Sequence, residues 1–343
     1  MKYILRALFS FLFISPLLAQ EIKILTWEYF LSEEVVDAFT KKTGHTVKIY
    51  FYDSEVDRNA ILVNGQGEKY DLVLVDNATT LLYGKAGILR PLDSLHIDNL
   101  QYIGQQWQES CGQYGIPYAK GTMGIVHRTS VSKNKIDSWN DILPPPKEHI
   151  GTTMMIKDDV DTVAIALLAQ GFDPFTRDEN ELKSAYSLLV AQSKYLLNYG
   201  YPISYTSEQG KDSKLTLAVI YSGDLYNIKK STGQNDWEYV VPKEGTLFFV
   251  DCFTSPSGGA LKDGTRAFLG FINDPAIAYK NASDVWFSTT NEAAQLMASD
   301  KYKNDSEISP DVETLKRSHR YQPLSSDDLV IRNRIVSILN INE

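Results

Sequence analysis

The chain has 343 residues, of which 43% are hydrophobic and 22% are charged, and its 43 acidic and 34 basic residues give a net charge of −9. This length exceeds that of one average domain and suits two α/β lobes. An acidic chain lacks the basic face that nucleic-acid binding requires. The charge balance therefore excludes a nucleic-acid partner and suits a small cationic ligand.

The first 19 residues are typical of an export signal. Lys2 and Arg6 precede the apolar run 7–18, and Ala19 offers a small residue for cleavage. No later apolar run approaches the roughly 18 residues that a membrane span requires. We therefore expect residues 1–19 to be a signal peptide, and the mature chain to be a soluble periplasmic monomer.

Strands and helices alternate in the first part of the chain. Ser32 is a favourable N-cap for a helix with acidic residues in its first turn, and Gly44 ends that helix. Such alternation predicts a mainly parallel sheet covered by helices on both faces. The expected strands are 21–26, 46–52 and 70–75, and the expected helices are 32–43, 58–63 and 79–85.

The same alternation returns later in the chain, after two short strands that a bend joins. These two strands are expected at 114–118 and 122–126, and a short helix is expected to open at Ser138. Strand 247–250 is interpreted as a crossing back to the first lobe. The lobes are therefore expected to comprise 20–121 with 252–300, and 122–251 with 301–343. The remaining expected elements are strands at 152–156 and 216–221, and helices at 162–170, 181–192, 265–271, 274–280, 292–297, 309–316 and 327–339.

Aromatic and acidic side chains follow several of these strands. In parallel α/β sheets, ligands lie outside the carboxyl ends of the strands, so residues far apart in sequence are expected to meet in one cleft. The residues that follow the strands are Trp27, Tyr29, Phe30, Asp76, Asp159 and Tyr221.

The stretch 240–256 combines an apolar strand with an acid. Leu247–Val250 leads directly into Asp251, which Cys252 and Phe253 follow. One interpretation is a core strand whose end reaches solvent at Asp251. The other is a site for an organic cation, in which the carboxylate supplies opposite charge and each ring adds about 0.5–2 kcal/mol of cation–π attraction.

Motifs of catalysis are missing from the sequence. The five histidines are scattered, with no metal-ligand spacing, and neither a Gly-x-Ser-x-Gly elbow nor a phosphate-binding loop is present. Acids and aromatic residues without a nucleophile–base pair indicate binding and not catalysis. No cofactor and no metal are expected.

Four motifs resemble the periplasmic solute-binding proteins of polyamine ABC transporters, the spermidine/putrescine-binding family. They are Trp27 with FTKKTG (39–44), YDLVLVD (70–76), GIPYAKGTMGIV (115–126) and PKEGTLFFVD (242–251). The resemblance implies a two-lobed type II periplasmic-binding-protein fold of the α/β class, with mainly parallel sheets and a hinge about which the lobes close on a ligand.

The resemblance implies rings that cover the ligand. Trp27 falls on the first stacking tryptophan of the family. Phe30 stands where the family has a tyrosine and Tyr29 lies one place earlier, so either ring is a candidate to face the ligand. Tyr221 and Phe249 each stand where the family has tryptophan.

The resemblance also implies polar ligand contacts. Asp251 matches the acid that holds an amine of the ligand, and Asp159 matches an acid that binds an amino group. Asp76 takes the place of a serine, and Gln322 matches a polar contact near the end of the chain. Three acids suit a triamine without ranking one polyamine over another, because each buried ammonium requires a carboxylate.

Two functions remain open under this resemblance. The first is delivery of a putrescine-, spermidine- or norspermidine-type polyamine to an ABC permease. The second is a polyamine-sensing receptor that docks on a membrane protein of cyclic di-GMP signalling. Departures from the family pattern are compatible with the sensing function. For example, Thr162 stands where the family has another acid, and the neighbouring Asp161 is a candidate to replace that acid.

Two cysteines, Cys111 and Cys252, remain after the signal segment. In an oxidising compartment they form either a disulfide or two buried free thiols. In the fold that the resemblance implies, both segments run through the hinge region, which favours the disulfide.

Overall fold

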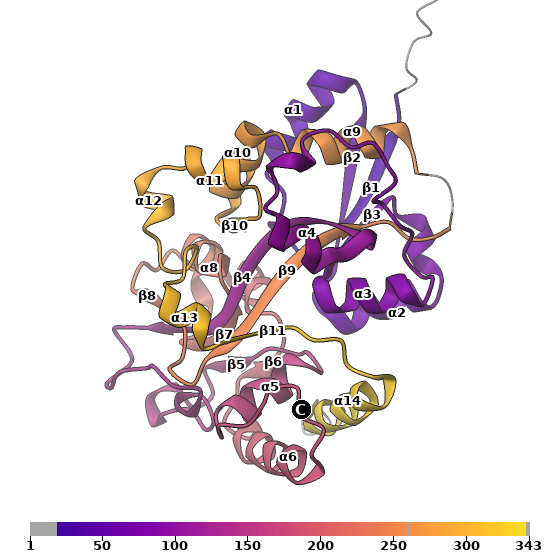
Figure 1. Cartoon of the computed structure of the whole chain (residues 1–343). Coiled ribbons are helices and arrows are strands. Elements are labelled where there is room, and N and C mark those ends of the chain that lie inside the picture. The colour runs from indigo at the N-terminus through magenta and orange to yellow at the C-terminus, as the bar shows by residue number, and fades with distance from the viewer. Residues whose placement is uncertain (1–18, 259–260, 341–343) are drawn as a thin grey trace, which may run out of the picture.

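The computed structural model describes residues 19–258 and 261–340, and these form two lobes connected by two long strands (Figure 1). The predicted signal peptide falls outside the described residues, apart from Ala19. Within the described part of the chain, no helix combines the length and apolar character that crossing a bilayer would require.

The first lobe, in the upper part of Figure 1, is built on three parallel strands with β1 in the middle. Ser32 caps α1 and Gly44, at φ +75°, ends it, as predicted. The strands are β1 (Glu21–Thr26), β2 (Thr46–Phe51), β3 (Leu72–Asp76) and the short β10 (Ser288–Thr289). The helices are α1 (Glu33–Thr43), α2 (Glu55–Val63), α3 (Asn77–Lys85), α4 (Gln105–Cys111), α9 (Asp263–Ile272), α10 (Pro275–Val285), α11 (Glu292–Met297) and α12 (Asp300–Lys303).

The second lobe, in the lower part of Figure 1, repeats this plan on three shorter parallel strands with β5 in the middle. Its strands are β5 (Thr153–Met155), β6 (Asn198–Tyr199), β7 (Leu217–Tyr221), β8 (Trp237–Val240) and β11 (Ser318–Arg320). Its helices are α5 (Asp161–Leu168), α6 (Glu179–Ser193), α7 (Pro202–Gln209), α8 (Asp224–Thr232), α13 (Val312–Lys316) and α14 (Ser326–Asn340).

The strands β4 (Gly115–Arg128) and β9 (Thr246–Thr254) run antiparallel through both lobes and give the strand order β2-β1-β3-β9-β4-β7-β5-β6. The sequence predicted two short strands with a bend where β4 is one strand. The irregularity appears as a register shift after Pro117, whose missing N–H cannot join the ladder. All nine residues of β9 are buried, so this strand continues past the predicted end at 250, and Asp251 lies inside it.

A disulfide joins Cys111, at the end of α4, to Cys252 in β9, with the two Cα atoms 6.0 Å apart. The backbone of β4 passes close to this bond. A Cβ atom at Gly115 would lie 2.7 Å from the Cβ atom of Cys252, so only glycine fits there without displacing the bond. The disulfide therefore ties the first lobe to one of the two strands that connect the lobes.

Helix α2 begins earlier than predicted, and this brings new side chains to the cleft. Ser54 is its N-cap, with the Ser54 hydroxyl accepting a hydrogen bond from the Asp57 N–H at 3.1 Å. The sequence predicted this helix only over 58–63, without its first turn. The extra first turn places Glu55 on the same face as Arg58.

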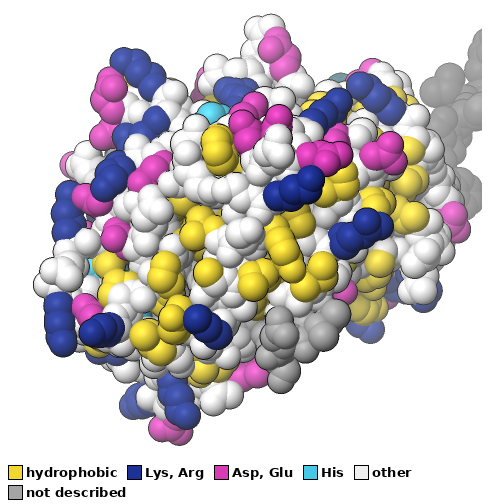
Figure 2. All heavy atoms as spheres, turned by 90° about the horizontal axis from the view of Figure 1, so that it is seen from below, with side chains coloured by type: hydrophobic (Ala, Val, Ile, Leu, Met, Phe, Trp, Pro, Cys, Tyr) yellow, Lys and Arg dark blue, Asp and Glu magenta, His cyan; other side chains and the backbone are white. Residues whose placement is uncertain are grey.

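The face of the molecule seen from below carries basic and acidic side chains side by side, with hydrophobic side chains between them (Figure 2). Such mixing of signs is typical of a soluble surface without a strong field of one sign.

Candidate ligand-binding site

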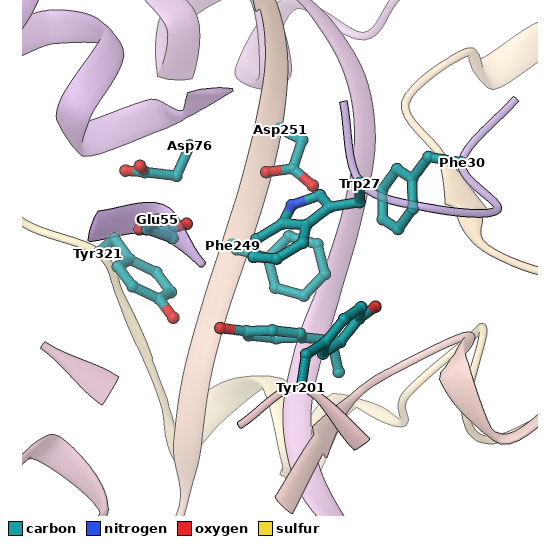
Figure 3. A pocket seen from close by; sticks show the side chains of 9 residues that line it. Trp27, Phe30, Glu55, Asp76, Tyr201, Phe249, Asp251 and Tyr321 are labelled. Atoms are coloured by element: carbon teal, nitrogen blue, oxygen red, sulfur yellow. The ribbon is translucent and has the colours of Figure 1, made fainter. Parts of the chain in front are cut away.

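A narrow cavity of about 20 Å³, close to the space of one water molecule, lies between the lobes, where β9 passes from one to the other. Figure 3 shows its carboxyl groups in the upper and left part of the view, with most of the rings below and beside them. The lining residues are Trp27, Phe30, Glu55, Asp76, Tyr201, Tyr221, Phe249, Asp251 and Tyr321.

The Asp251 carboxylate is buried in this cavity without a partner. The residue is 4% exposed, and its carboxylate forms no hydrogen bond or ion pair with any residue that the structure describes. Burial and, secondarily, the charge of Asp76 raise the pKa of Asp251 to about 7, against the lowering effect of Arg58. Asp251 is therefore the acid in the cavity that most needs a cation.

Asp76 lies directly opposite Asp251 in the antiparallel pair of β3 and β9. Like charges opposite each other destabilise a sheet, and the surroundings of Asp76 offset this. Its Oδ1 accepts a hydrogen bond from the Thr79 N–H at 2.9 Å and so caps α3. Its Oδ2 lies 3.0 Å from Nη2 of Arg58.

Arg58 is fully buried beside the cavity and pairs with two of its acids. Besides the bond to Asp76, its Nη1 lies 3.2 Å from Oε1 of Glu55. The guanidinium also lies 5.5 Å from the ring centroid of Tyr52. A cation of the chain itself therefore neutralises part of the acidic wall.

Aromatic rings form the opposite wall, where Trp27 of the first lobe contacts rings of the second lobe. Its ring centroid lies 5.2 Å from that of Tyr201 and 6.1 Å from that of Tyr221. Tyr221 meets Phe249 edge to face at 5.6 Å. Phe30 stacks on Phe287 at 5.7 Å. These faces suit a chain of methylenes that carries positive charge at its ends.

A second buried acid, Asp161, lies behind two of the lining tyrosines. The hydroxyls of Tyr221 and Tyr321 donate to its two carboxylate oxygens, each at 2.6 Å. Burial and then the neighbouring Asp158 raise the pKa of Asp161 to about 8. The Asp161 carboxyl group therefore orients both rings from behind the cavity.

Six of the residues predicted for the site line the cavity together. Tyr29 does not: it is 39% exposed, and its hydroxyl lies 3.3 Å from that of Ser207. Of the two candidate rings, the structure therefore turns Phe30 to the cavity. The six lining residues are Trp27, Phe30, Asp76, Tyr221, Phe249 and Asp251.

The structure places the remaining two predicted contacts, Asp159 and Gln322, away from the cavity lining. Asp159 accepts a hydrogen bond from the Asn333 side chain at 2.8 Å, and the preceding Asp158 accepts hydrogen bonds from the N–H groups of Val160 and Asp161. Gln322 is exposed, and the preceding Tyr321 faces the cavity in its place.

Sequence reasoning missed four residues of the site: Glu55, Arg58, Tyr201 and Tyr321. An arginine three residues after a glutamate in a helix is a signal for an ion pair, although not for its burial. Tyr201 lies between the short strand β6 and α7, where the sequence predicted no strand. Only long-range packing brings these side chains together.

Two α/β lobes that close on a small cavity of carboxylates and rings define a binding protein for a small solute. The chain belongs to the family of bacterial extracellular solute-binding proteins, whose model matches residues 34–310.

Individual relatives cover most of the chain. A "Norspermidine sensor" of Vibrio cholerae is 28% identical over 93% of this chain and 88% of its own length. A "Spermidine/putrescine-binding periplasmic protein" of Escherichia coli is 25% identical over 84% of this chain and 83% of its own length.

Solved structures share the fold. The TpPotD lipoprotein of Treponema pallidum superposes with a TM-score of 0.78 at 18% identity, covering 94% of this chain and 99% of that one. A spermidine/putrescine substrate-binding protein from Streptococcus pneumoniae has a TM-score of 0.75 at 22% identity, with the same coverage.

Proposed function

We propose that this chain is a periplasmic polyamine-binding protein that delivers its ligand to a membrane ABC permease. Its family consists of extracellular solute-binding proteins, and several relatives are named for norspermidine, spermidine or putrescine. Names containing the word periplasmic support the same compartment here. The role that we propose is reversible binding by a monomer, without catalysis and without a nucleic-acid partner.

The observation that carries the proposal is the unpartnered, buried Asp251 carboxylate among aromatic faces. An unpaired buried charge costs several kcal/mol, so a site of this kind is complete only with a cation. A polyamine carries ammonium groups separated by methylenes. Asp251 supplies the charge partner, and the rings of Trp27 and Phe249 cover the methylenes.

Isothermal titration calorimetry with putrescine, norspermidine, spermidine and spermine tests the proposal. We expect at least one polyamine to bind with a micromolar or lower dissociation constant at pH 8 and fixed salt. The matched control is 1,4-butanediol, which keeps the carbon chain of putrescine and lacks its charges. Failure of all four amines to bind, or equal binding of the diol, would contradict the proposal.

A second candidate is a sensory role at the membrane, which the 28% identity to the norspermidine sensor favours. Both candidates require polyamine binding and differ in the membrane partner. Deletion of the gene separates them: loss of radiolabelled polyamine uptake supports transport. Unchanged uptake with an altered cyclic di-GMP level supports sensing.

A further inference from the structure

Arg58 is a cation that the chain itself places against the acidic wall of the cavity. Its side chain is fully buried. Nε and Nη2 also donate to Oδ1 of the neighbouring Asn59, at 3.1 and 3.0 Å. Contacts with Asn59, Glu55 and Asp76 hold the guanidinium in one position, so it acts as a fixed charge of the site.

We propose that Arg58 sets the number of positive charges that the site accepts, so that the preferred ligand is a diamine. This inference rests on the proposed polyamine function and narrows its ligand class. Arg58 occupies the place beside Asp76 that one ammonium group of a longer polyamine would otherwise take.

The charges that line the cavity support a diamine. Three carboxylates, those of Glu55, Asp76 and Asp251, face one guanidinium, which leaves an excess of two negative charges. Two ammonium groups balance this excess. A third would enter without a free carboxylate and close to Arg58, and an unbalanced buried charge is strongly unfavourable.

Asp161 does not supply the missing partner. It is not among the residues that line the cavity, and each of its oxygens already accepts a tyrosine hydroxyl, from Tyr221 and from Tyr321.

The test compares the dissociation constants of putrescine and spermidine for three proteins by isothermal titration calorimetry. Wild type should prefer putrescine by at least tenfold. Arg58→Met has a neutral side chain of similar volume and removes one positive charge. In this variant the ratio of the putrescine to the spermidine dissociation constant should change by at least tenfold in favour of spermidine.

The double variant Arg58→Met/Asp76→Asn restores the excess of two negative charges and is the matched control. Its ratio should return to within threefold of the wild-type ratio, whatever its absolute affinities. Because this variant replaces the ion pair by two neutral groups, it lacks the guanidinium but keeps the wild-type charge balance. It therefore distinguishes an effect of charge from an effect of losing the buried side chain. Circular dichroism melting of each protein reports folding.

Three outcomes overturn the inference while the proposed function stands. One is a wild type that binds spermidine as tightly as putrescine, a measurement that needs no variant. Another is an Arg58→Met variant that binds both ligands more weakly by the same factor. A third is a double variant whose ratio of dissociation constants stays equal to that of Arg58→Met. If wild type binds no polyamine, the proposed function fails and this inference fails with it. Binding of both amines without selectivity refutes only the inference.

Discussion

Asp251→Asn should weaken polyamine binding while it stabilises the ligand-free protein. Asparagine keeps the shape of the side chain and removes the charge. In the complex, the ligand ammonium would then be buried against a neutral amide. Truncations of desolvated charge pairs cost about 2–5 kcal/mol, or roughly 30-fold to several-thousand-fold in dissociation constant.

The ligand-free protein should respond in the opposite direction. The Asp251 carboxylate has no hydrogen-bond partner among the described residues and lies across the sheet from Asp76. A pKa of about 7 in place of 3.8 means that ionising this carboxylate at pH 8 costs the folded state up to about 4 kcal/mol. Asp251→Asn removes that cost, so the melting temperature without ligand should rise by a few degrees.

Calorimetric titration and thermal melting of both proteins at pH 8 and equal salt measure the two effects. The reasoning is refuted if Asp251→Asn binds polyamine within threefold of wild type, a loss below about 1 kcal/mol. It is also refuted if the variant loses affinity and stability together, because Asp251 would then support the fold and not the ligand.

Three further results should follow from the structure. The free energy of unfolding without ligand should fall from pH 5 to pH 8. Burial raises the pKa of Asp161 from 3.8, and that of Glu307 from 4.5, to about 8, so the folded chain binds more protons than the unfolded chain in this range. Urea titrations at each pH measure this free energy, and a rise with pH would contradict the prediction. Alanine at Tyr221 or Phe249 should weaken polyamine binding by about 1–3 kcal/mol through lost burial and lost cation–π contact. If calorimetry shows that the variants bind normally although they are less stable, both rings belong to the core. Replacing both disulfide cysteines by serine should cost up to ~4–5 kcal/mol of stability in denaturant titrations, and two free thiols in the denatured, unreduced wild type would contradict the bond.

Local sequence signals predicted the helices and strands best. Ser32 and Gly44 mark the ends of α1 because capping depends on adjacent backbone groups. The rule for parallel strands brought Trp27, Asp76 and Tyr221 together, since each follows or ends a strand that points to the same cleft.

The remaining parts of the site depend on features that sequence patterns do not encode. The sequence predicts a ligand contact at Asp159 and names Asp161 only as a substitute for a neighbouring acid. In the structure Asp159 accepts a hydrogen bond from Asn333, whereas Asp161 accepts the hydroxyls of two tyrosines that line the cavity. The buried pair of Arg58 with Asp76 joins a helix to a strand 18 residues later. Such contacts arise only when the lobe has packed.

A crystal structure of the chain with saturating putrescine at pH 8 tests the central claim most directly. The account predicts an ammonium nitrogen within about 3 Å of the Asp251 carboxylate, with the methylenes against the rings of Trp27 and Phe249. A ligand bound elsewhere, or one in the cavity whose ammonium groups leave Asp251 unpaired, would contradict it.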